Sequence, residues 1–279
     1  MRPWLAFIVC GAMLASSLSC SVNILQTFGN TTSNKALYED AQIAINKGDY
    51  TGALDKISKM TGAFPSTAAV LELKASAYGG LCGFNFLNFV TAFQGIGTQN
   101  LFKFLLANFN AASATYIDNC ILAQSTIQSI GAVGVRTTDQ NLFLALIEMG
   151  KIGNILSYYA DPTHTGSATA GFNPCTVGGS RSLGGSITDS DAREIGVGIS
   201  IAAENLNAIS GSVSLGSGSL TSINSLCSAL PAAYNFCSVT DPTALTASEV
   251  KGVLSLIKES TVIGLGANCT GDVSVCFCP

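Results

Sequence analysis

Ten cysteines are the residues of this chain whose number and spacing most directly predict chemistry. Cys10 lies in an apolar N-terminal run, and removal of that run during export would leave nine. An odd number of cysteines in an exported protein requires one with a separate role. The other eight suit four disulfide bonds formed in an oxidising compartment. They are Cys82, Cys120, Cys175, Cys227, Cys237, Cys269, Cys276 and Cys278.

The N-terminal segment has the pattern of a secretory signal peptide. Arg2 precedes an apolar run of 12 residues (4–15), and a serine-rich stretch follows at 16–19. A helix that crosses the bilayer needs roughly 20 apolar residues. Because the run is too short for that role, we predict that residues 1–19 are a signal peptide that is removed.

Cys20 is the cysteine to which we assign the separate role. The stretch LASSLSCSVN (14–23) resembles the lipobox of bacterial lipoproteins, whose cysteine is acylated and begins the mature chain. Leu18 lies one position nearer the cysteine than in the usual motif, so a paired or free Cys20 in an ordinary secreted protein is the alternative. A fully acylated Cys20 would hold a domain on a membrane. By the same resemblance, Ser21 favours the outer membrane, and polar residues 20–33 are the expected tether.

The pairing of the other eight cysteines is open, because eight cysteines allow 105 connectivities. Two combinations stand out from their positions, namely Cys82 with Cys120 in neighbouring helical segments, and Cys227 with Cys237 around a turn. The tail at 262–279 contains three cysteines and almost no core residues. We expect it to lie against the body as a strap, with Cys175 as one candidate partner.

Other residues that could do chemistry fit no recognisable site. His164 is the only histidine and could act as a base, but the chain has no Gly-x-Ser-x-Gly elbow, so an exposed loop position is expected. Asp189 and Asp191 lack the spacing of calcium loops and suit a helix start. The cysteines of CFC (276–278) are closer together than paired zinc ligands usually are. We therefore predict no catalytic residue, no metal and no cofactor.

The composition excludes several kinds of partner. A formal net charge of -4 without a basic cluster argues against nucleic acid and against electrostatic attachment to a membrane. Charged residues make up 11% of the chain, compared with about 25% in a typical protein. The surface must therefore be built mainly from Ser, Thr, Asn, Gln and Gly.

The clearest periodic block spans residues 34–65. Two sets of apolar residues at helical spacing are separated by Gly48 and Asp49, which predicts a helical hairpin. The block resembles one tetratricopeptide repeat, matching it at Ala41, Gly48, Tyr50, Ala53 and Pro65 and departing from it at Leu37, Ile57 and Met60. The resemblance implies two closely packed antiparallel helices. Since a solenoid normally needs three repeats, the rest of the chain must supply packing of its own.

Helical patterns continue through the rest of the chain. Further helices are expected within 66–80, 137–160, 188–210 and 246–260. Capping boxes at Thr137 with Gln140 and at Thr246 with Glu249 mark two of their starts. Residues 161–187 form a Gly/Ser/Thr-rich loop, and a loop of this length in a compact domain is usually functional or mobile.

Half of the 14 phenylalanines lie between 84 and 109. Most of them are expected in the core, because aromatic side chains dominate buried area. A second hypothesis is that Phe84, Phe86 and Phe89 line a groove for a peptide or a lipid-like partner, since helical solenoids often bind on a concave face.

These observations predict a mainly α-helical fold. Residues 34–279 form one domain in which helical hairpins pack into an irregular α-bundle or short solenoid, stapled by disulfides. We expect a non-enzymatic, lipid-anchored binding or scaffold protein of the bacterial cell envelope that holds a protein partner. The alternative is a structural envelope protein without a specific ligand, and an enzyme is least favoured. The order of lipobox, repeat and Cys-rich helices resembles envelope lipoproteins of predatory or related Gram-negative bacteria.

Overall fold

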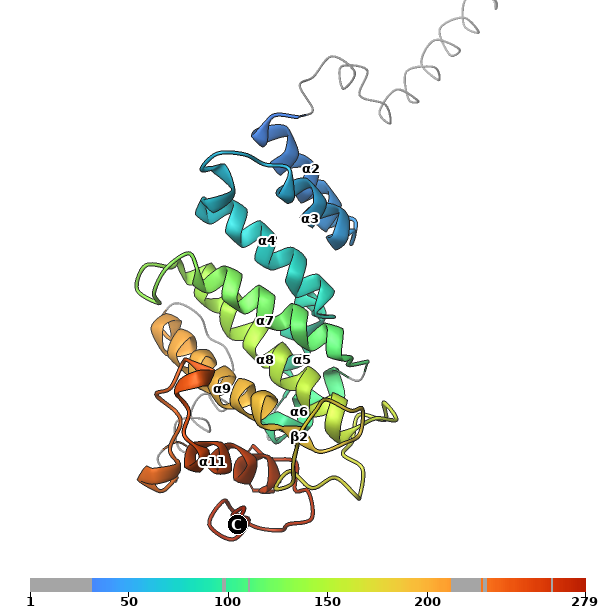
Figure 1. Ribbon diagram of the computed structural model, residues 1–279, viewed down its shortest axis with the longest axis vertical. Coiled ribbons are helices and arrows are strands. Elements are labelled where there is room, and N and C mark those ends of the chain that lie inside the picture. The colour runs from blue at the N-terminus through green and yellow to red at the C-terminus, as the bar shows by residue number, and fades with distance from the viewer. Residues whose placement is uncertain (1–31, 97–98, 110, 212–226, 228–229, 262) are drawn as a thin grey trace, which may run out of the picture.

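The computed structural model describes residues 32–279 apart from 97–98, 110, 212–226, 228–229 and 262 (Figure 1). The fold is mainly α-helical, as predicted. The helices are α2 (Asn34–Asn46), α3 (Tyr50–Ser58), α4 (Ala68–Leu81), α5 (Phe86–Gln94), α6 (Leu101–Asn108), α7 (Ala114–Gln128), α8 (Thr138–Ala160), α9 (Asp189–Ile209) and α11 (Ala247–Lys258). The strands β1 (Val177–Gly178) and β2 (Ile187–Thr188) pair in parallel. Short 3-10 helices are η3 (Phe64–Ser66), η4 (Ala232–Tyr234) and η5 (Pro242–Ala244).

Helices begin where the sequence places capping side chains. The Thr137 hydroxyl accepts a hydrogen bond from the Gln140 backbone N–H, and the Gln140 side chain accepts one from the Thr137 N–H. Thr246 and Glu249 form the same reciprocal pair at the start of α11. Between α2 and α3, Gly48 has φ 77°, a conformation that glycine adopts without steric cost. Local interactions therefore set these helix limits.

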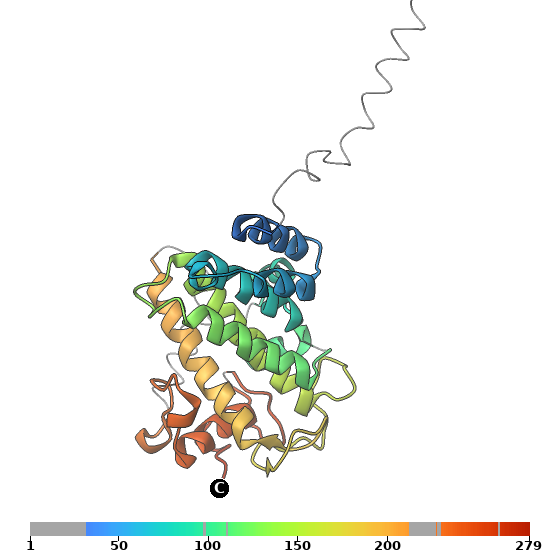
Figure 2. The same cartoon turned by 45° about the horizontal axis from the view of Figure 1, so that its top comes forward.

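The helices form a layered row (Figure 1, Figure 2). The hairpin of α2 and α3 packs on α4, which packs on α7; α7 packs on α8, α8 on α9, and α9 on α11. The helices α5 and α6 leave this row, and α6 packs on α8. The result is a disulfide-stapled helical bundle with the layered character of a short solenoid.

Two hydrophobic cores run through the row. A small core joins α2, α3 and one face of α4, and it contains Leu37, Ala41, Ala53, Ile57, Met60, Val70, Leu73 and Ala77. The main core extends from the other face of α4 to α11 and the C-terminal segment. Because α4 contributes Ala77 to the first core and Ala75 to the second, it joins the hairpin to the body.

Helix α8 is the centre of the main core. It is flanked by α6, α7 and α9, and every residue from 144 to 157 is buried. A helix that is buried on all sides must pair the polar side chains it carries. Glu148, Lys151 and Asn154 are such side chains.

The C-terminal segment lies against α6 and the long loop. The Phe102 backbone N–H donates to the Ile263 carbonyl oxygen over 2.7 Å, and the Asn268 side-chain amide donates to the Phe172 carbonyl oxygen over 3.0 Å. Loop 161–187 is irregular, as expected, except for the short pairing of β1 with β2 at its end. These contacts bring together three parts of the chain that are far apart in sequence.

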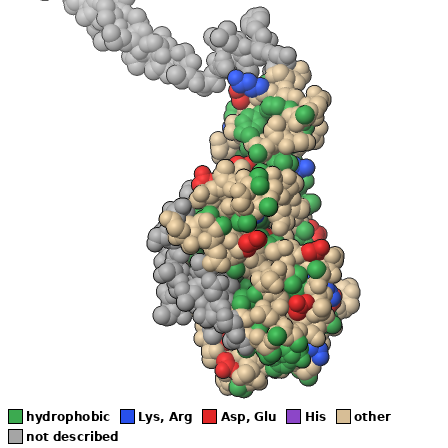
Figure 3. All heavy atoms as spheres, turned by 90° about the vertical axis from the view of Figure 1, so that its left-hand side faces the viewer, with side chains coloured by type: hydrophobic (Ala, Val, Ile, Leu, Met, Phe, Trp, Pro, Cys, Tyr) green, Lys and Arg blue, Asp and Glu red, His purple; other side chains and the backbone are tan. Residues whose placement is uncertain are grey.

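The surface carries few charges. Figure 3 shows one face on which a few acidic and basic side chains are spread among a larger apolar and uncharged surface. Large exposed apolar residues are also scattered, at Ile43, Leu122, Val135, Val177, Leu183 and Val275. Within the described ranges, none of the helices combines the length and apolar character needed to cross a bilayer.

Candidate functional site

The eight cysteines predicted to form disulfides do form four disulfide bonds, which confirms the prediction. The pairs are Cys82 with Cys120, Cys175 with Cys278, Cys227 with Cys237, and Cys269 with Cys276. The bond from Cys175 spans 103 residues and ties the long loop to the end of the chain. All eight cysteines are therefore part of structural crosslinks. The described residues contain no group of three or more His, Cys, Asp or Glu side chains that could hold a metal ion.

Several predicted sites lie outside the described residues. Cys20 and the signal peptide at 1–19 do, and so does nearly all of the tether at 20–33. The backbone of Phe86 begins α5, whereas its side chain is not among those described.

Two of the three phenylalanines proposed for a groove, Phe84 and Phe89, are buried, although Phe84 also lines a cavity described below. Phe89 is 4% exposed, and its ring packs 5.3 to 5.9 Å, between centroids, from four other rings, those of Phe84, Phe93, Phe104 and Phe109. Phe84 is also buried, at 6% exposed. These rings face inward because α6 packs on α8 and the rings of α5 pack against a ring of α6, so their aromatic area stabilises the core.

A depression does exist beside Phe84, between the hairpin and the body. This cavity, here called the α3–α8 notch, has a volume of about 430 Å³, and the residues that shape it include Ile45, Asn46, Tyr50, Ser76, Asn85 and Phe143. A Cβ atom on Gly80 would lie 2.3 Å from the Tyr50 ring, so only glycine allows that ring to approach α4. The described lining of the notch is uncharged, with two half-buried aromatic rings, those of Tyr50 and Phe143.

Asp191 anchors the long loop to α9. The helix cap is the Thr188 hydroxyl, which accepts from the Asp191 N–H, so the capping role expected of Asp191 belongs to Thr188. The Asp191 carboxylate is fully buried. It accepts hydrogen bonds from two nitrogens of Arg181, at 2.9 and 2.6 Å, and from the Tyr159 hydroxyl. Hydrogen bonding to Asp191 raises the pKa of Arg181. Burial and the hydrogen bond to Asp191 raise the pKa of Tyr159 to about 12.

His164 and Asp189 behave as expected of surface residues. His164 is exposed in the loop with φ 57°, and its backbone N–H donates to the Asp161 carbonyl oxygen. Asp189 accepts from Arg193 one turn later on α9, an exposed pair that contributes little to stability. Neither residue is part of a catalytic arrangement within the described chain.

A buried ionic cluster lies between α7, α8 and α9, and the sequence pattern did not predict it. The Lys151 ammonium is 2.8 Å from a carboxylate oxygen of Glu148 and 2.8 Å from one of Glu194, and it also donates to the Gln124 side chain. Desolvation raises the pKa of Glu148, and Lys151 offsets only part of this effect. Burial lowers the pKa of Lys151, but the two carboxylates outweigh burial and raise it. The two carboxylates thus stabilise the charged form of Lys151.

One signal could have revealed this cluster. Residues 144–157 contain apolar or small side chains on every helical face, which is typical of a helix buried all round. Glu148 and Lys151 interrupt that pattern three residues apart, the spacing of neighbours on one helix face. The partner Glu194 lies 43 residues further along the chain, and only the packing of α8 on α9 identifies it.

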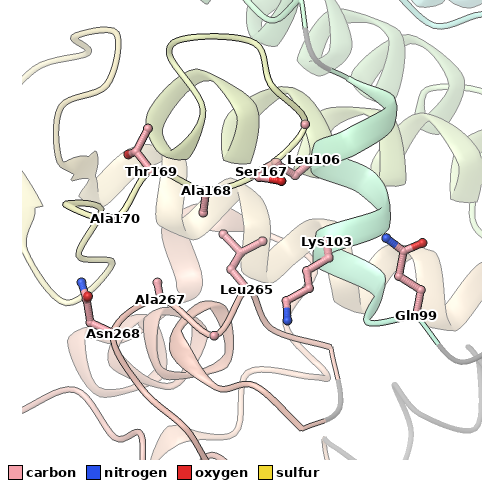
Figure 4. A pocket seen from close by; sticks show the side chains of 12 residues that line it. Gln99, Lys103, Leu106, Ser167, Ala168, Thr169, Ala170, Leu265, Ala267 and Asn268 are labelled. Carbon is pink, nitrogen blue, oxygen red and sulfur yellow. The ribbon is translucent and has the colours of Figure 1, made fainter.

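A second cavity of about 440 Å³ lies between α6, residues 166–170 and residues 265–268 (Figure 4). Lys103 and Gln99 border it on one side, and Asn268 borders it on the other (Figure 4). This pocket was not predictable from residue spacing, because its three walls are separated by roughly 60 and 95 residues along the chain.

Comparison of the chain with known proteins found no relative, so neither cavity can be compared with a known site. No protein-family model, no curated protein and no solved structure matches it.

Proposed function

We propose that this protein is a non-catalytic, lipid-anchored binding or scaffold protein of the bacterial cell envelope, and that it holds a protein partner at the α3–α8 notch. The observation that carries the proposal is the uncharged notch between the hairpin and the body. Its two partly exposed aromatic rings, Tyr50 and Phe143, are of a residue type that is enriched at protein interfaces relative to the rest of the surface.

The hairpin supports this proposal by its packing. Ala41 and Ala53 are fully buried in the small core, as the close approach of two helices in a tetratricopeptide-like unit requires. The hairpin and α4 therefore present a rigid wall to the notch. A rigid surface loses less conformational entropy when a partner binds.

The lining indicates the kind of segment that fits. Asn46, Ser76 and Asn85 offer side-chain hydrogen bonds beside the rings of Tyr50 and Phe143. An uncharged segment that inserts one apolar side chain and exposes its backbone amides matches this surface. A charged segment would lose hydration without gaining an opposite charge.

Membrane attachment at Cys20 is part of the same proposal. Fourteen residues, 20–33, precede α2, and a fully extended chain spans at most about 3.5 Å per residue, so the reach is about 50 Å at most. The anchor then keeps the notch close to the membrane. We propose the outer membrane as the location.

Site-specific cross-linking tests the partner site. A photoreactive residue at position 46, beside the notch, should give a discrete adduct in envelope membranes. The same residue at exposed position 58, on α3 but outside the notch lining, should not. Tyr50→Ala should abolish the adduct, and the protein identified by mass spectrometry should bind the purified chain but not the variant. Equal adducts at both positions, or an adduct unaffected by Tyr50→Ala, would contradict the proposal.

The alternative is a structural envelope protein without a ligand, for which low charge and four disulfides provide durability. In that case neither position gives a specific adduct. Membrane fractionation tests the anchor separately, because Cys20→Ser should move the protein to the soluble fraction. Unchanged membrane association of this variant would contradict lipidation without bearing on the notch.

A further inference from the structure

The pocket between α6, residues 166–170 and residues 265–268 has the electrostatics of an anion site. Lys103 is the one charged residue in its described lining. Its side chain extends from α6 toward the 265–268 segment (Figure 4), where a Cβ atom on Gly266 would lie 3.8 Å from the ammonium nitrogen. Among the residues that the structure describes, none forms an ion pair or hydrogen bond with this ammonium group.

Two buried carboxylates beside the pocket walls, those of Asp161 and Glu259, bond backbone amides and form no ion pair with Lys103. Asp161 is fully buried and accepts from the N–H groups of Thr165 and Gly166, at 2.9 and 2.6 Å. Glu259 is fully buried and accepts from the N–H groups of Ile263 and Gly264. Both acids hold the backbone next to a pocket wall, and neither belongs to the lining.

The walls are fixed before any ligand arrives. The Gly266 N–H donates to the Glu259 carbonyl oxygen over 2.8 Å, and Asn268 is bonded to the loop at Phe172. Two disulfides, Cys175 with Cys278 and Cys269 with Cys276, staple the C-terminal segment to the loop and to itself. A pocket preorganised in this way loses little entropy on binding.

The remaining residues of the pocket lining suit a small ligand that carries hydroxyl groups. Gln99, Ser167, Thr169 and Asn268 offer neutral hydrogen-bonding side chains around the edge, and Ala168, Ala170, Leu265 and Ala267 form a smooth apolar surface between them (Figure 4). Neutral donors and acceptors of this kind bind hydroxyl groups. The volume of about 440 Å³ lies within the usual range of small-molecule sites.

We propose that this pocket binds a small hydroxylated carboxylate, of the size and chemistry of an acidic sugar. The carboxylate pairs with Lys103, and the hydroxyl groups bind the polar rim around Leu265 and Ala267. Lys103 supplies a single positive charge, which a singly charged carboxylate balances, whereas a phosphate group carries about −1.5 to −2 at neutral pH. The ligand is either a free sugar acid or an acidic sugar within a larger glycan, and both present the same group to Lys103.

Ligand-observed NMR and calorimetry on the purified full chain test this proposal. The probes are D-glucuronate, its neutral counterpart D-glucose, inorganic phosphate and a glucuronate-containing oligosaccharide. We expect glucuronate to bind at concentrations of about 10 mM or below, in the weak range of specific binding. Lys103→Gln should weaken this binding up to about fivefold, the range expected for an exposed ion pair. Tighter binding of the oligosaccharide than of the monomer would identify a glycan as the source of the ligand.

Two variants keep the result interpretable. Lys47→Gln, at an exposed lysine at the end of α2, should bind glucuronate like the wild type. Ala168→Phe should block the pocket while Lys103 remains. Absence of glucuronate binding to the wild type, equal binding of glucose, stronger binding of phosphate, or unchanged binding by Lys103→Gln would each overturn the proposal. The exposed position of Lys103 makes misfolding of its variant unexpected, and a thermal melt checks this.

Discussion

Replacing Lys151 by methionine should strongly destabilise this protein. Methionine retains most of the side-chain volume but leaves the Glu148 and Glu194 carboxyl groups without their cation. The Lys151 and Glu148 side chains are fully buried, and that of Glu194 is 11% exposed. Removal of one partner from a buried ionic cluster costs about 3–5 kcal/mol. Because the Glu194 side chain keeps 11% of its surface in solvent, we expect the lower end, about 3 kcal/mol.

The pH dependence follows from the same cluster. The pKa of Glu148 is raised in the folded protein, above the ordinary value of 4.5. Its contribution to stability is therefore complete below the ordinary glutamate pKa and is lost as the pH rises through the folded pKa. The slope from this one group is at most about 1.4 kcal/mol per pH unit. Glu148→Gln keeps the shape, removes the titration, and should flatten this decline.

Urea unfolding with the disulfides intact measures both effects. With an m-value of about 3 kcal/mol/M, Lys151→Met should lower the urea midpoint by about 1 M. The control is Lys59→Met, since Lys59 pairs with Asp55 at an exposed site and such pairs contribute at most about 1 kcal/mol. The reasoning fails if Lys151→Met costs less than about 1 kcal/mol, or if Glu148→Gln retains the wild-type pH dependence.

Other predictions concern the loop anchor and the packing of α8. Arg181→Ala should cost about 2–3 kcal/mol, because it leaves the buried Asp191 carboxylate without its cation while Arg181 itself is partly exposed. Limited proteolysis should then cut within 161–187, and an unchanged cleavage pattern would argue against the anchor. Gly153→Ala should cost about 1–2 kcal/mol in thermal unfolding, since the new Cβ would lie 2.3 Å from the Phe109 ring. Gly134→Ala, with open space around it, is its control, and equal stability of the two variants would contradict the clash.

Local features of the fold were predictable from the sequence. The capping boxes at Thr137 and Thr246 involve residues three apart, and the hairpin at 34–65 follows from helical spacing and one glycine turn. Such interactions connect neighbours in the chain, so residue order reveals them. The aromatic segment shows the limit, because the density of rings around Phe89 favours a core but is also compatible with a groove. The packing of α6 on α8, and of Phe89 against the α6 ring of Phe104, placed Phe89 inside.

By itself, the sequence determined the helical class, the principal helix starts and the use of eight cysteines in disulfides, because composition, periodicity and parity are properties of the chain. Tertiary structure alone decided which cysteines pair, that Lys151 meets Glu194, and that Lys103 faces a pocket built from three distant segments. Those contacts arise when side chains from different helices bury apolar area together. Their partners are therefore set by packing in three dimensions, which residue spacing does not encode directly.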